Sequence, residues 1–367
     1  MKFFVFSPTL ETLGIVSNYN FMTHTQQFAG SGTFKLKAPF TEKLFAILAE
    51  ENILYWEDSG KKNAVFIETV ICENDEGGTY ITASGKNIRA YLGRRIVWKN
   101  IHFTGTAEDF ARQMVEANAI NPTDVFRELP LLSLAPRKGL TPTITTLTEN
   151  ENLEALLDNI TATTDVGFDI TLDKTTRSLS FVAFEGTDRR TTQTATPWLI
   201  VSRDRNNVVS ESYTRSGVAF RNSALVSGYT DDDTGTRFEV EINAGEGLSR
   251  REIYVSGRAS KPRPDEGIGE TEAQATARYR AELLQKGLES LAKQIMVESL
   301  EVEPNSSLIE KLNVGDKITA LERQYNLELQ TFVSEITLYY GHEGRRIDIT
   351  LGDAIPTIYE KLRKDIE

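Results

Sequence analysis

The pair Gly85-Lys86 is the first candidate for chemistry, because a glycine followed by a lysine can close a phosphate-binding loop. Such a loop also needs a glycine five positions before the pair and a serine or threonine directly after it, so that backbone amides surround the phosphates and a hydroxyl holds Mg²⁺. Tyr80 and Asn87 stand at these two positions. The pair therefore does not predict a nucleotide site.

Two other short motifs match catalytic patterns only in part. Asp233-Thr234-Gly235 has the letters of an aspartic-protease triplet, but that chemistry needs two carboxylates that share a proton, and the chain has no second such triplet. Ser290 and Lys293 form a Ser-x-x-Lys motif without the companion motifs of serine acyl-enzymes. We expect the first motif in a solvated turn and the second on the exposed face of a helix.

The chain has three histidines, His24, His102 and His342, and one cysteine, Cys72. The histidines are far apart and no two of them have the spacing of a zinc motif, so we expect no metal and no cofactor. Carboxylates could still complete a site in three dimensions, and a histidine-based hydrolytic site stays open for the same reason. We favour histidines in polar loops or at strand ends. Cys72 ends an apolar run, and we expect it to be buried in a strand.

Arg94 and Arg95 allow two interpretations. They could bind an anion, or they could stand at a strand end and form ion pairs with carboxylates across an interface. The chain has 53 acidic residues, and the planar guanidinium of arginine binds a carboxylate through two parallel hydrogen bonds. We therefore favour the interface.

The balance of charge excludes some partners. The chain has 41 basic and 53 acidic residues, a formal net charge of -12 and a pI near 5.0, whereas a groove that follows nucleic-acid phosphates needs a surplus of lysine and arginine. We expect no sequence-specific nucleic-acid partner. No apolar run is long enough to span a membrane. Ser7, Pro8 and Glu11 interrupt the apolar N-terminus, which we interpret as a first strand rather than a secretion signal.

Most of the sequence alternates between apolar and polar residues, as half-buried strands do. The clearest cases are residues 34–38, 167–173, 237–243 and 346–352. Three helices interrupt this pattern: one after Thr106, one over residues 151–160, and one over residues 271–295. We expect Thr148 and Glu151 to cap the second helix and Thr271 and Gln274 to cap the third. The packing face expected for the third helix is Ala273, Ala277, Ala281, Leu284, Leu288, Leu291 and Ile295.

Three linkers rich in Pro, Thr, Ser or Gly suggest the domain boundaries, at residues 134–148, 187–197 and 261–269. They divide the chain into an N-terminal β region of residues 1–100, completed by strands from residues 196–260, a small α/β insert of residues 101–195, and a second β region of residues 196–367 that carries the long helix. The expected fold class is mainly β with an α+β insert.

Several motifs, each weak alone, occur in an order that resembles one family. The segment ASGKNIRAYLGRRIV (83–97) is followed by LSFVAFEGTDRRT (179–191), by RNNVVSESYTRSGVAFRNSALVSGY (205–229) and by a Val-Gly-Asp turn at residues 314–316. This order resembles the tail hub, or baseplate hub, proteins of long-tailed, non-contractile phages, a group that includes the Gp37-like phage tail proteins. The residues that carry the match are Gly85, Tyr91, Leu92, Arg94, Arg95, Ile96, Asn207, Asn222, Gly228, Gly315 and Asp316.

The resemblance implies two tail-tube-like β-barrels per subunit and a homotrimeric ring, so that three subunits present six similar barrels. It implies a virion protein of the phage or prophage tail tip, made in the bacterial host cytoplasm. The implied partners are the distal tail protein or tail tube, the tape-measure protein, and a spike, fibre or receptor-binding protein. An acidic chain suits a channel that must release DNA.

The resemblance also gives expected roles to its residues. Gly85 would allow a tight turn, Tyr91 and Leu92 would enter a barrel core, and Arg94 and Arg95 would pair with acids of a neighbouring subunit or of the tube. Many relatives carry a C-terminal cell-wall hydrolase or fibre extension. This chain ends after the amphipathic segment of residues 354–367, so we expect none here and no enzymatic activity.

Two other functions stay open. A tail-associated hydrolase of peptidoglycan would need paired carboxylates, and Asp158, Asp169 and Glu185 are the candidates. A carbohydrate-binding module would need aromatic platforms, for which Trp56, Trp98 and Trp198 are available.

Overall fold

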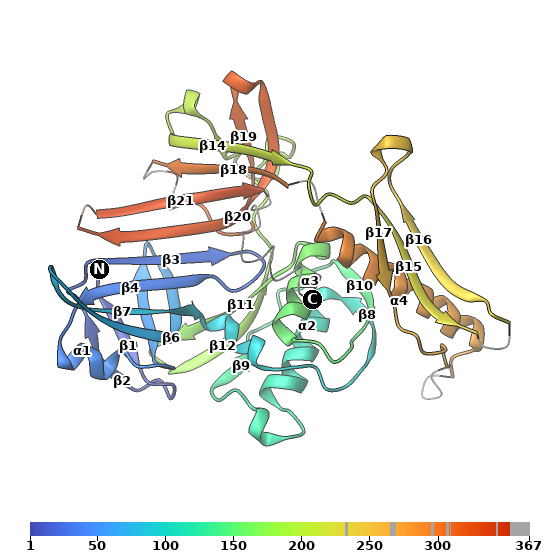
Figure 1. The fold of residues 1–367 in the computed structure, drawn as a ribbon, viewed down its shortest axis with the longest axis horizontal. Helices are drawn as coiled ribbons and strands as arrows, with labels where there is room; N and C mark the ends of the chain where they lie inside the picture. Colours follow the sequence, from blue (N-terminus) through green and yellow to red (C-terminus); the bar gives the residue numbers. More distant parts are fainter. Residues whose placement is uncertain are drawn as a thin grey trace.

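The computed structural model describes residues 1–231, 234–264, 269–294, 297–305, 308, 310–342 and 344–352. Asp233, Ile295 and the segment 354–367, all named above, lie outside the described residues. The fold is mainly β, as expected, and its strands belong to one large sheet and three small ones (Figure 1).

Residues 1–87 supply seven neighbouring strands of the large sheet, in the order β3-β4-β7-β6-β5-β1-β2. The alternation of apolar and polar residues predicted such strands, and the structure confirms the one over residues 34–38 as part of β4. A short helix, α1 (Glu42–Ile47), connects β4 to β5. The strands are β1 (Phe3–Phe6), β2 (Thr12–Val16), β3 (Phe21–Gln27), β4 (Thr33–Pro39), β5 (Ile53–Asp58), β6 (Lys61–Asp75) and β7 (Gly78–Asn87).

The C-terminal part of the chain continues the same sheet. The long strand β20 (Leu327–Gly341) pairs through its first half with β19 (Lys317–Glu322) and through its second half with β3. At β3 the N-terminal strands are therefore continued by residues 327–341. We expected residues 196–260 to complete them; these residues supply strands of the same sheet, but those strands do not pair directly with the N-terminal ones. The remaining strands are β13 (Ile200–Val201), β14 (Val208–Ser216), β18 (Val297–Pro304) and β21 (Gly344–Gly352).

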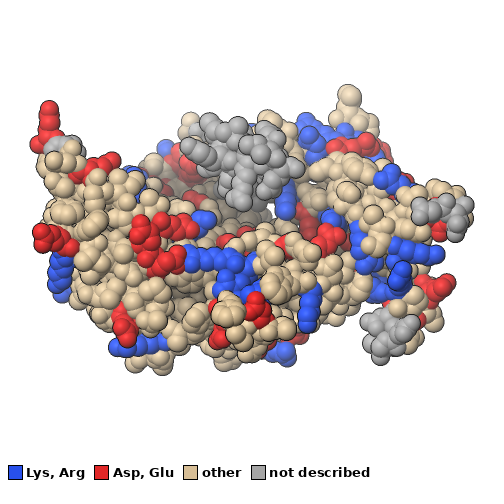
Figure 2. All heavy atoms as spheres, turned by 60° about the horizontal axis from the view of Figure 1, so that its bottom comes forward, with Lys and Arg blue, Asp and Glu red and all other residues tan. Residues whose placement is uncertain are grey.

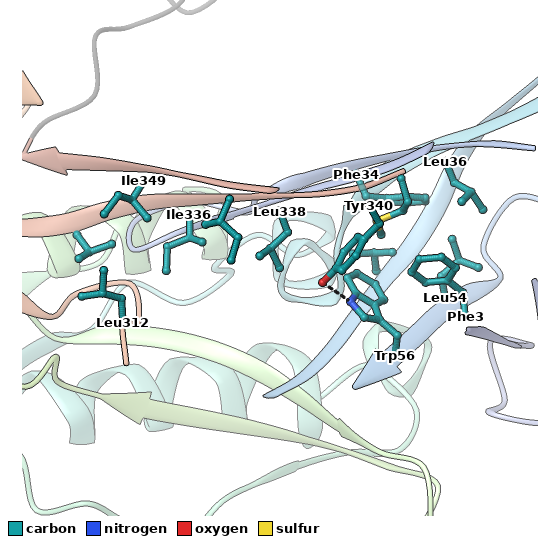
Figure 3. Close-up of a cluster of buried hydrophobic side chains, with 14 of the residues drawn as sticks. Phe3, Phe34, Leu36, Leu54, Trp56, Leu312, Ile336, Leu338, Tyr340 and Ile349 are labelled. Atoms are coloured by element: carbon teal, nitrogen blue, oxygen red, sulfur yellow. Dashed lines mark hydrogen bonds between the residues drawn. The ribbon is translucent and has the colours of Figure 1, made fainter. Parts of the chain in front are cut away.

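The strand pairings join thirteen strands in one sheet with β14 and β2 at the ends of its main path. The division into two closed barrels stays a prediction. The two halves share one hydrophobic core, which Figure 3 shows around Trp56 and Tyr340. The Trp56 indole N–H donates to the Tyr340 hydroxyl at 3.2 Å, and that hydroxyl donates to Asp58 at 2.6 Å. Because each fully buried side chain of this kind stabilises the fold by about 1.5–3 kcal/mol, separating the halves would be costly.

The expected α/β insert lies against the other face of the N-terminal strands. Tyr55 and Phe66 alternate with the core residues Trp56 and Val65, so they face away from the first core and into a second one. Tyr91 and Leu92, which we expected in a barrel core, are buried in this second core. The elements of the insert are β8 (His102–Thr106), α2 (Ala107–Val115), β9 (Leu132–Leu134), β10 (Thr143–Leu147), α3 (Leu153–Thr164), β11 (Gly167–Asp173) and β12 (Ser178–Phe184).

The two helices of the insert, α2 and α3, begin at different kinds of capping residue. The helix α2 follows Thr106, as expected, and the Thr106 hydroxyl caps it by accepting a hydrogen bond from the Asp109 amide at 3.1 Å. Asn152 caps α3, and its side chain accepts hydrogen bonds from the amides of Glu154 and Ala155. The predicted cap by Thr148 is wrong, because the Thr148 hydroxyl instead bridges the turn before β8.

A third unit consists of β15 (Ser223–Thr230), β16 (Arg237–Asn243), β17 (Glu252–Ser256) and α4 (Glu272–Ala292), at the right of Figure 1. The region 196–367 is thus divided between the large sheet and this unit. Thr271 and Gln274 form the expected capping box of α4. The expected packing face is wrong: Leu284 and Leu288 are each 41% exposed. The buried side of α4 carries Ala275, Tyr279, Leu283 and Gly287, because the helix approaches β15 closely.

Short helical turns complete the structure. They are Ile88–Arg94, Glu116–Ile120, Val125–Arg127, Arg203–Arg205, Gly247–Ser249 and Arg323–Tyr325. Cys72 lies in β6, as expected, but it is exposed. It lies beyond the end of β5, so that part of β6 has a neighbouring strand on one side only.

Candidate assembly site

Two of the family motifs meet in space although about 130 residues separate them. The backbone amide of Thr187, which follows β12, donates to the buried carboxylate of Asp316 at 2.9 Å, and the amide of Asn313 donates to the same carboxylate at 3.0 Å. The Lys317 amide donates to the Thr187 carbonyl at 3.0 Å, and the Arg189 amide donates to the Lys317 carbonyl at 2.7 Å. Asp316 therefore holds the end of the insert against the C-terminal strands.

Glycine is required on both sides of this junction. A Cβ at Gly186 would overlap the backbone of Gly315. Gly315 itself has φ +87°, a conformation that favours glycine, and a Cβ there would overlap the ring of Phe28. The expected turn at residues 314–316 is thus present, and its role is to let two segments of backbone touch.

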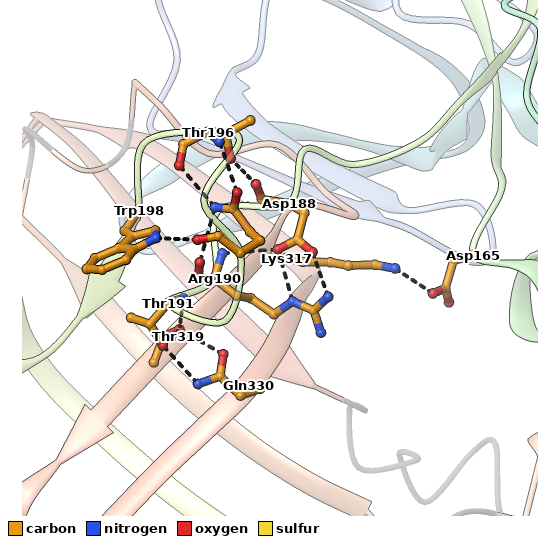
Figure 4. A network of polar contacts seen from close by, with 10 residues as sticks. Asp165, Asp188, Arg190, Thr191, Thr196, Trp198, Lys317, Thr319 and Gln330 are labelled. Carbon is orange, nitrogen blue, oxygen red and sulfur yellow. Dashed lines mark hydrogen bonds and ion pairs between the residues drawn. The ribbon is translucent and has the colours of Figure 1, made fainter.

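The loop of residues 187–198 adds a network of polar contacts beyond the junction (Figure 4). The Arg190 guanidinium binds Asp188 at 2.6 Å, and this bond holds the pKa of the Asp188 carboxyl below its usual range. The Thr191 amide donates to the Thr319 hydroxyl at 2.9 Å, and Lys317 reaches Asp165 of the insert at 2.7 Å. The side-chain amide of Gln330 in β20 donates to the Thr191 hydroxyl at 3.1 Å. The loop therefore contacts both β19 and β20, and β19 in turn is linked to the insert.

The arginine pair of the opening motif binds within its own chain. Arg94 forms two hydrogen bonds with Glu51, of 2.6 and 2.9 Å, and lies over the rings of Phe66 and Tyr91. Arg95 donates to three backbone carbonyl oxygens, at residues 94, 127 and 128. Pairing of either arginine with a neighbouring subunit stays a prediction.

Gly85 does not form the tight turn that we expected. It lies within β7, where a Cβ would overlap the Phe66 carbonyl of β6 beside an irregularity in the pairing of Ile67 and Thr69. Glycine is needed there because the two strands come unusually close.

The other family residues also fix local structure. Asn207 bridges the Ser202 amide and the Ile200 carbonyl, at 2.9 and 2.7 Å, and so shapes the turn between β13 and β14. Asn222 bridges the Ser249 carbonyl and the Arg251 amide, both at 2.9 Å, before β17. At Gly228 a Cβ would overlap the Tyr279 hydroxyl, so this glycine sets the distance between β15 and α4.

A cavity of about 280 Å³ lies between the N-terminal strands and the insert. Arg89, His24 and Asp169 line it; burial raises the pKa of Asp169 to about 6 and lowers that of His24 to about 4. Asp158 forms a partly buried ion pair with Arg89, whereas Glu185 is exposed after β12 and does not line the cavity. The structure therefore does not bring together the three carboxylates proposed for a hydrolase.

The remaining chemical candidates are dispersed. His24 binds Asn87 at 2.7 Å inside the first core, His102 binds Glu282 of α4, and His342 lies in an exposed turn. Among the described residues, no three His, Cys, Asp or Glu side chains gather in a way that could hold a metal ion. Of the tryptophans, Trp56 is buried, whereas Trp98 and Trp198 are exposed.

The distribution of charged side chains does not indicate a nucleic-acid site either. Figure 2 shows acidic and basic side chains interspersed over the lower face, without a continuous basic groove. In the described part of the chain no helix has both the length and the apolar character needed to cross a bilayer.

The family model for the siphovirus ReqiPepy6 Gp37-like protein matches residues 2–353, nearly the whole chain. The chain belongs to this siphovirus Gp37-like family. The resemblance drawn from the motifs is thereby confirmed. No match among curated proteins was found.

Solved structures share the fold of this Gp37-like protein. The 43 kDa tail protein of prophage MuSo2 from Shewanella oneidensis is 15% identical, with 96% of this chain and 98% of that chain covered and a TM-score of 0.55. Prophage tail protein gp18 from Listeria monocytogenes is 12% identical, with 100% and 98% covered and a TM-score of 0.57. A tail protein from Neisseria meningitidis is 9% identical, with 96% of each chain covered and a TM-score of 0.58. The fold is therefore that of prophage tail proteins.

Sequence reasoning found the residues of the Asp316 junction but not its geometry. It missed Arg127, whose guanidinium lies 3.9 Å from the ring of Trp98, and Phe126, which is almost fully exposed. The only local indication of this surface is that apolar residues stand next to charged ones in the segment 124–128. Such a pattern does not distinguish an exposed phenylalanine from a buried one.

Proposed function

We propose that this Gp37-like protein is the subunit of a phage or prophage tail hub. In this proposal three copies form a ring that joins the six-fold tail tube or distal tail ring to a three-fold spike, fibre or receptor-binding assembly. The ring encloses the channel through which DNA leaves, and holds the end of the tape-measure protein before that. The protein acts in the virion by assembly and makes or breaks no covalent bond.

The observation that carries the proposal is the pairing of β3 with β20. It joins an N-terminal and a C-terminal set of strands in one sheet over one core, so each chain presents two sets of strands. Three chains with two sets of strands each would present six sets, the number needed for a three-fold ring to match a six-fold tube. The family match covers both sets, and the structural relatives are tail proteins.

The family residues support an architectural role. Asp316, Asn207 and Asn222 satisfy backbone groups at turns, and Gly186 and Gly228 permit close contacts between segments. The net charge of -12 would on balance repel the phosphates of DNA, so that the channel does not retain it.

Native mass measurement and negative-stain imaging of the purified full chain test the proposal. We expect a species of three times 41.1 kDa and ring-shaped particles with three-fold symmetry and six lobes around the channel. A particle of two-fold symmetry, a ring without six lobes, or a monomer at the highest soluble concentration would contradict it.

A further inference from the structure

An exposed apolar surface lies at the edge of the insert, directly after the arginine pair. We call it the Trp98 patch, and it consists of Arg95, Ile96, Trp98, Val125, Phe126 and Arg127. Phe126 is 93% exposed, Val125 69%, Trp98 51% and Ile96 49%. Single exposed apolar residues are normal, but neighbouring ones from two segments of a chain mark an interaction surface.

Contacts between the two segments hold the patch in one arrangement. The Arg127 guanidinium lies 3.9 Å from the centre of the Trp98 ring and also donates to the Ile96 carbonyl. Arg95 donates in turn to the Arg127 carbonyl at 2.5 Å and to the Glu128 carbonyl at 3.2 Å. Because these contacts already hold Arg95, Trp98 and Arg127, a partner would lose little conformational entropy in binding these three side chains.

Neither guanidinium group of the patch forms an ion pair with an acid of the described chain, although Asp124 and Glu128 lie close by. The hydrogen bonds of Arg95 go to carbonyl oxygens, and those of Arg127 go to the Ile96 carbonyl and the Asn118 amide oxygen. Arg94, by contrast, is paired with Glu51. In a chain with 12 more acids than bases, two neighbouring guanidinium groups bound only to neutral oxygens stand out as a place for a carboxylate.

Tryptophan, arginine and exposed aromatic residues are the types that contribute most to binding energy at protein interfaces. Two guanidinium groups with Asp124 and Glu128 close by do not make a phosphate-binding track, which disfavours a nucleic acid. The segment 125–127 forms the turn at the lower edge of Figure 1, at the opposite end of the molecule from β18–β21. A second copy that pairs through the large sheet would therefore leave the patch free.

We propose that the Trp98 patch docks a separate tail protein through a segment in which carboxylates alternate with apolar side chains. This inference rests on the proposed hub function and adds a surface and a kind of partner to it. The carboxylates would bind the guanidinium groups of Arg95 and Arg127, and the apolar side chains would cover Trp98 and Phe126.

Fluorescence anisotropy with the full-length protein tests the proposal. The probe is a fluorescein-labelled peptide in which glutamate alternates with phenylalanine and leucine; the controls are the same peptide with lysine for each glutamate and a single-stranded oligothymidine. We expect the acidic peptide alone to bind, and its affinity to fall as salt is raised. The variant with Arg95→Glu and Arg127→Glu should lose affinity about tenfold or more.

Phe126→Ser is the second variant, because a side chain this exposed is not needed for folding, and it should also weaken binding about tenfold. Leu248→Ser, a fully exposed leucine in the third unit, is the matched control and should change nothing. Equal binding of wild type and variants, no binding of the acidic peptide, or preferred binding of oligothymidine would overturn the proposal. Self-association of the wild-type protein would also overturn the proposal if the variant Phe126→Ser abolished it. Ring formation by Phe126→Ser should equal that of wild type, and a ring missing from wild type and variant alike would count against the hub function alone.

Discussion

Removal of the Asp316 carboxylate should destabilise the protein at the junction of the insert and the C-terminal strands. The carboxylate is buried and accepts two backbone hydrogen bonds, from Thr187 at 2.9 Å and from Asn313 at 3.0 Å. A hydrogen bond to a charged group contributes about 1.5–3 kcal/mol. Because residue 313 is exposed and its amide regains water, we take the lower value for each bond and expect Asp316→Ala to lower the free energy of unfolding by about 3 kcal/mol.

Urea unfolding followed by tryptophan fluorescence measures this loss. Asp316→Asn keeps one acceptor oxygen and should lose about half as much. Asp204→Ala is the matched control, because Asp204 is a partly exposed acid paired with Arg323, and it should cost less than about 1 kcal/mol.

Hydrogen exchange locates the effect. In Asp316→Ala, amides of residues 187–199 should exchange faster, whereas those of β3 and β4 should not. An Asp316→Ala variant within about 1 kcal/mol of wild type, or one in which exchange rises evenly over the whole chain, would refute the role of this carboxylate as the holder of the junction.

Three further predictions concern single side chains. Burial raises the pKa of Glu151 to about 7, so the free energy of unfolding should fall as pH rises from about 4.5 to 7. Glu151→Gln should therefore be about 1–2 kcal/mol more stable than wild type at pH 8 but equally stable at pH 4. Urea unfolding at both pH values measures this difference. Gly228→Ala should displace Tyr279 and speed amide exchange in α4, whereas Gly341→Ala, which has room, should not. Arg94→Ala breaks a partly exposed ion pair and should lower the free energy of unfolding by less than about 1 kcal/mol. If sedimentation then shows that the variant no longer forms rings although it remains folded, its expected role at a subunit interface is supported.

The sequence allowed prediction of elements whose pattern is local. The alternation in residues 237–243 gave β16, and Thr271 with Gln274 gave the start of α4, since both signals lie within a few residues. The packing face of α4 was wrong because the choice between neighbouring stripes depends on its partner. Gly228 in β15 and Gly287 in α4 let the sheet approach the helix closely, and this favours the stripe with Tyr279 over the stripe with Leu284.

Long-range contacts were beyond the reach of pattern reasoning. Nothing near residue 24 indicates that β3 pairs with a strand more than 300 residues later. The same holds for the contact of Arg127 with Trp98 and for the carboxylate of Asp316 beneath Thr187. The family resemblance pointed to the correct residues at the junction, but only the structure shows that two motifs form one site.

The pairing of β3 with β20 has a consequence for biosynthesis. When the N-terminal strands leave the ribosome, one edge of β3 has no partner until residues 327–341 have been made. Contacts between such distant segments slow folding, and an unpaired edge strand invites aggregation. The nascent chain therefore has to remain soluble for most of its translation, and expression of the first 100 residues alone would produce an incomplete sheet rather than a stable domain.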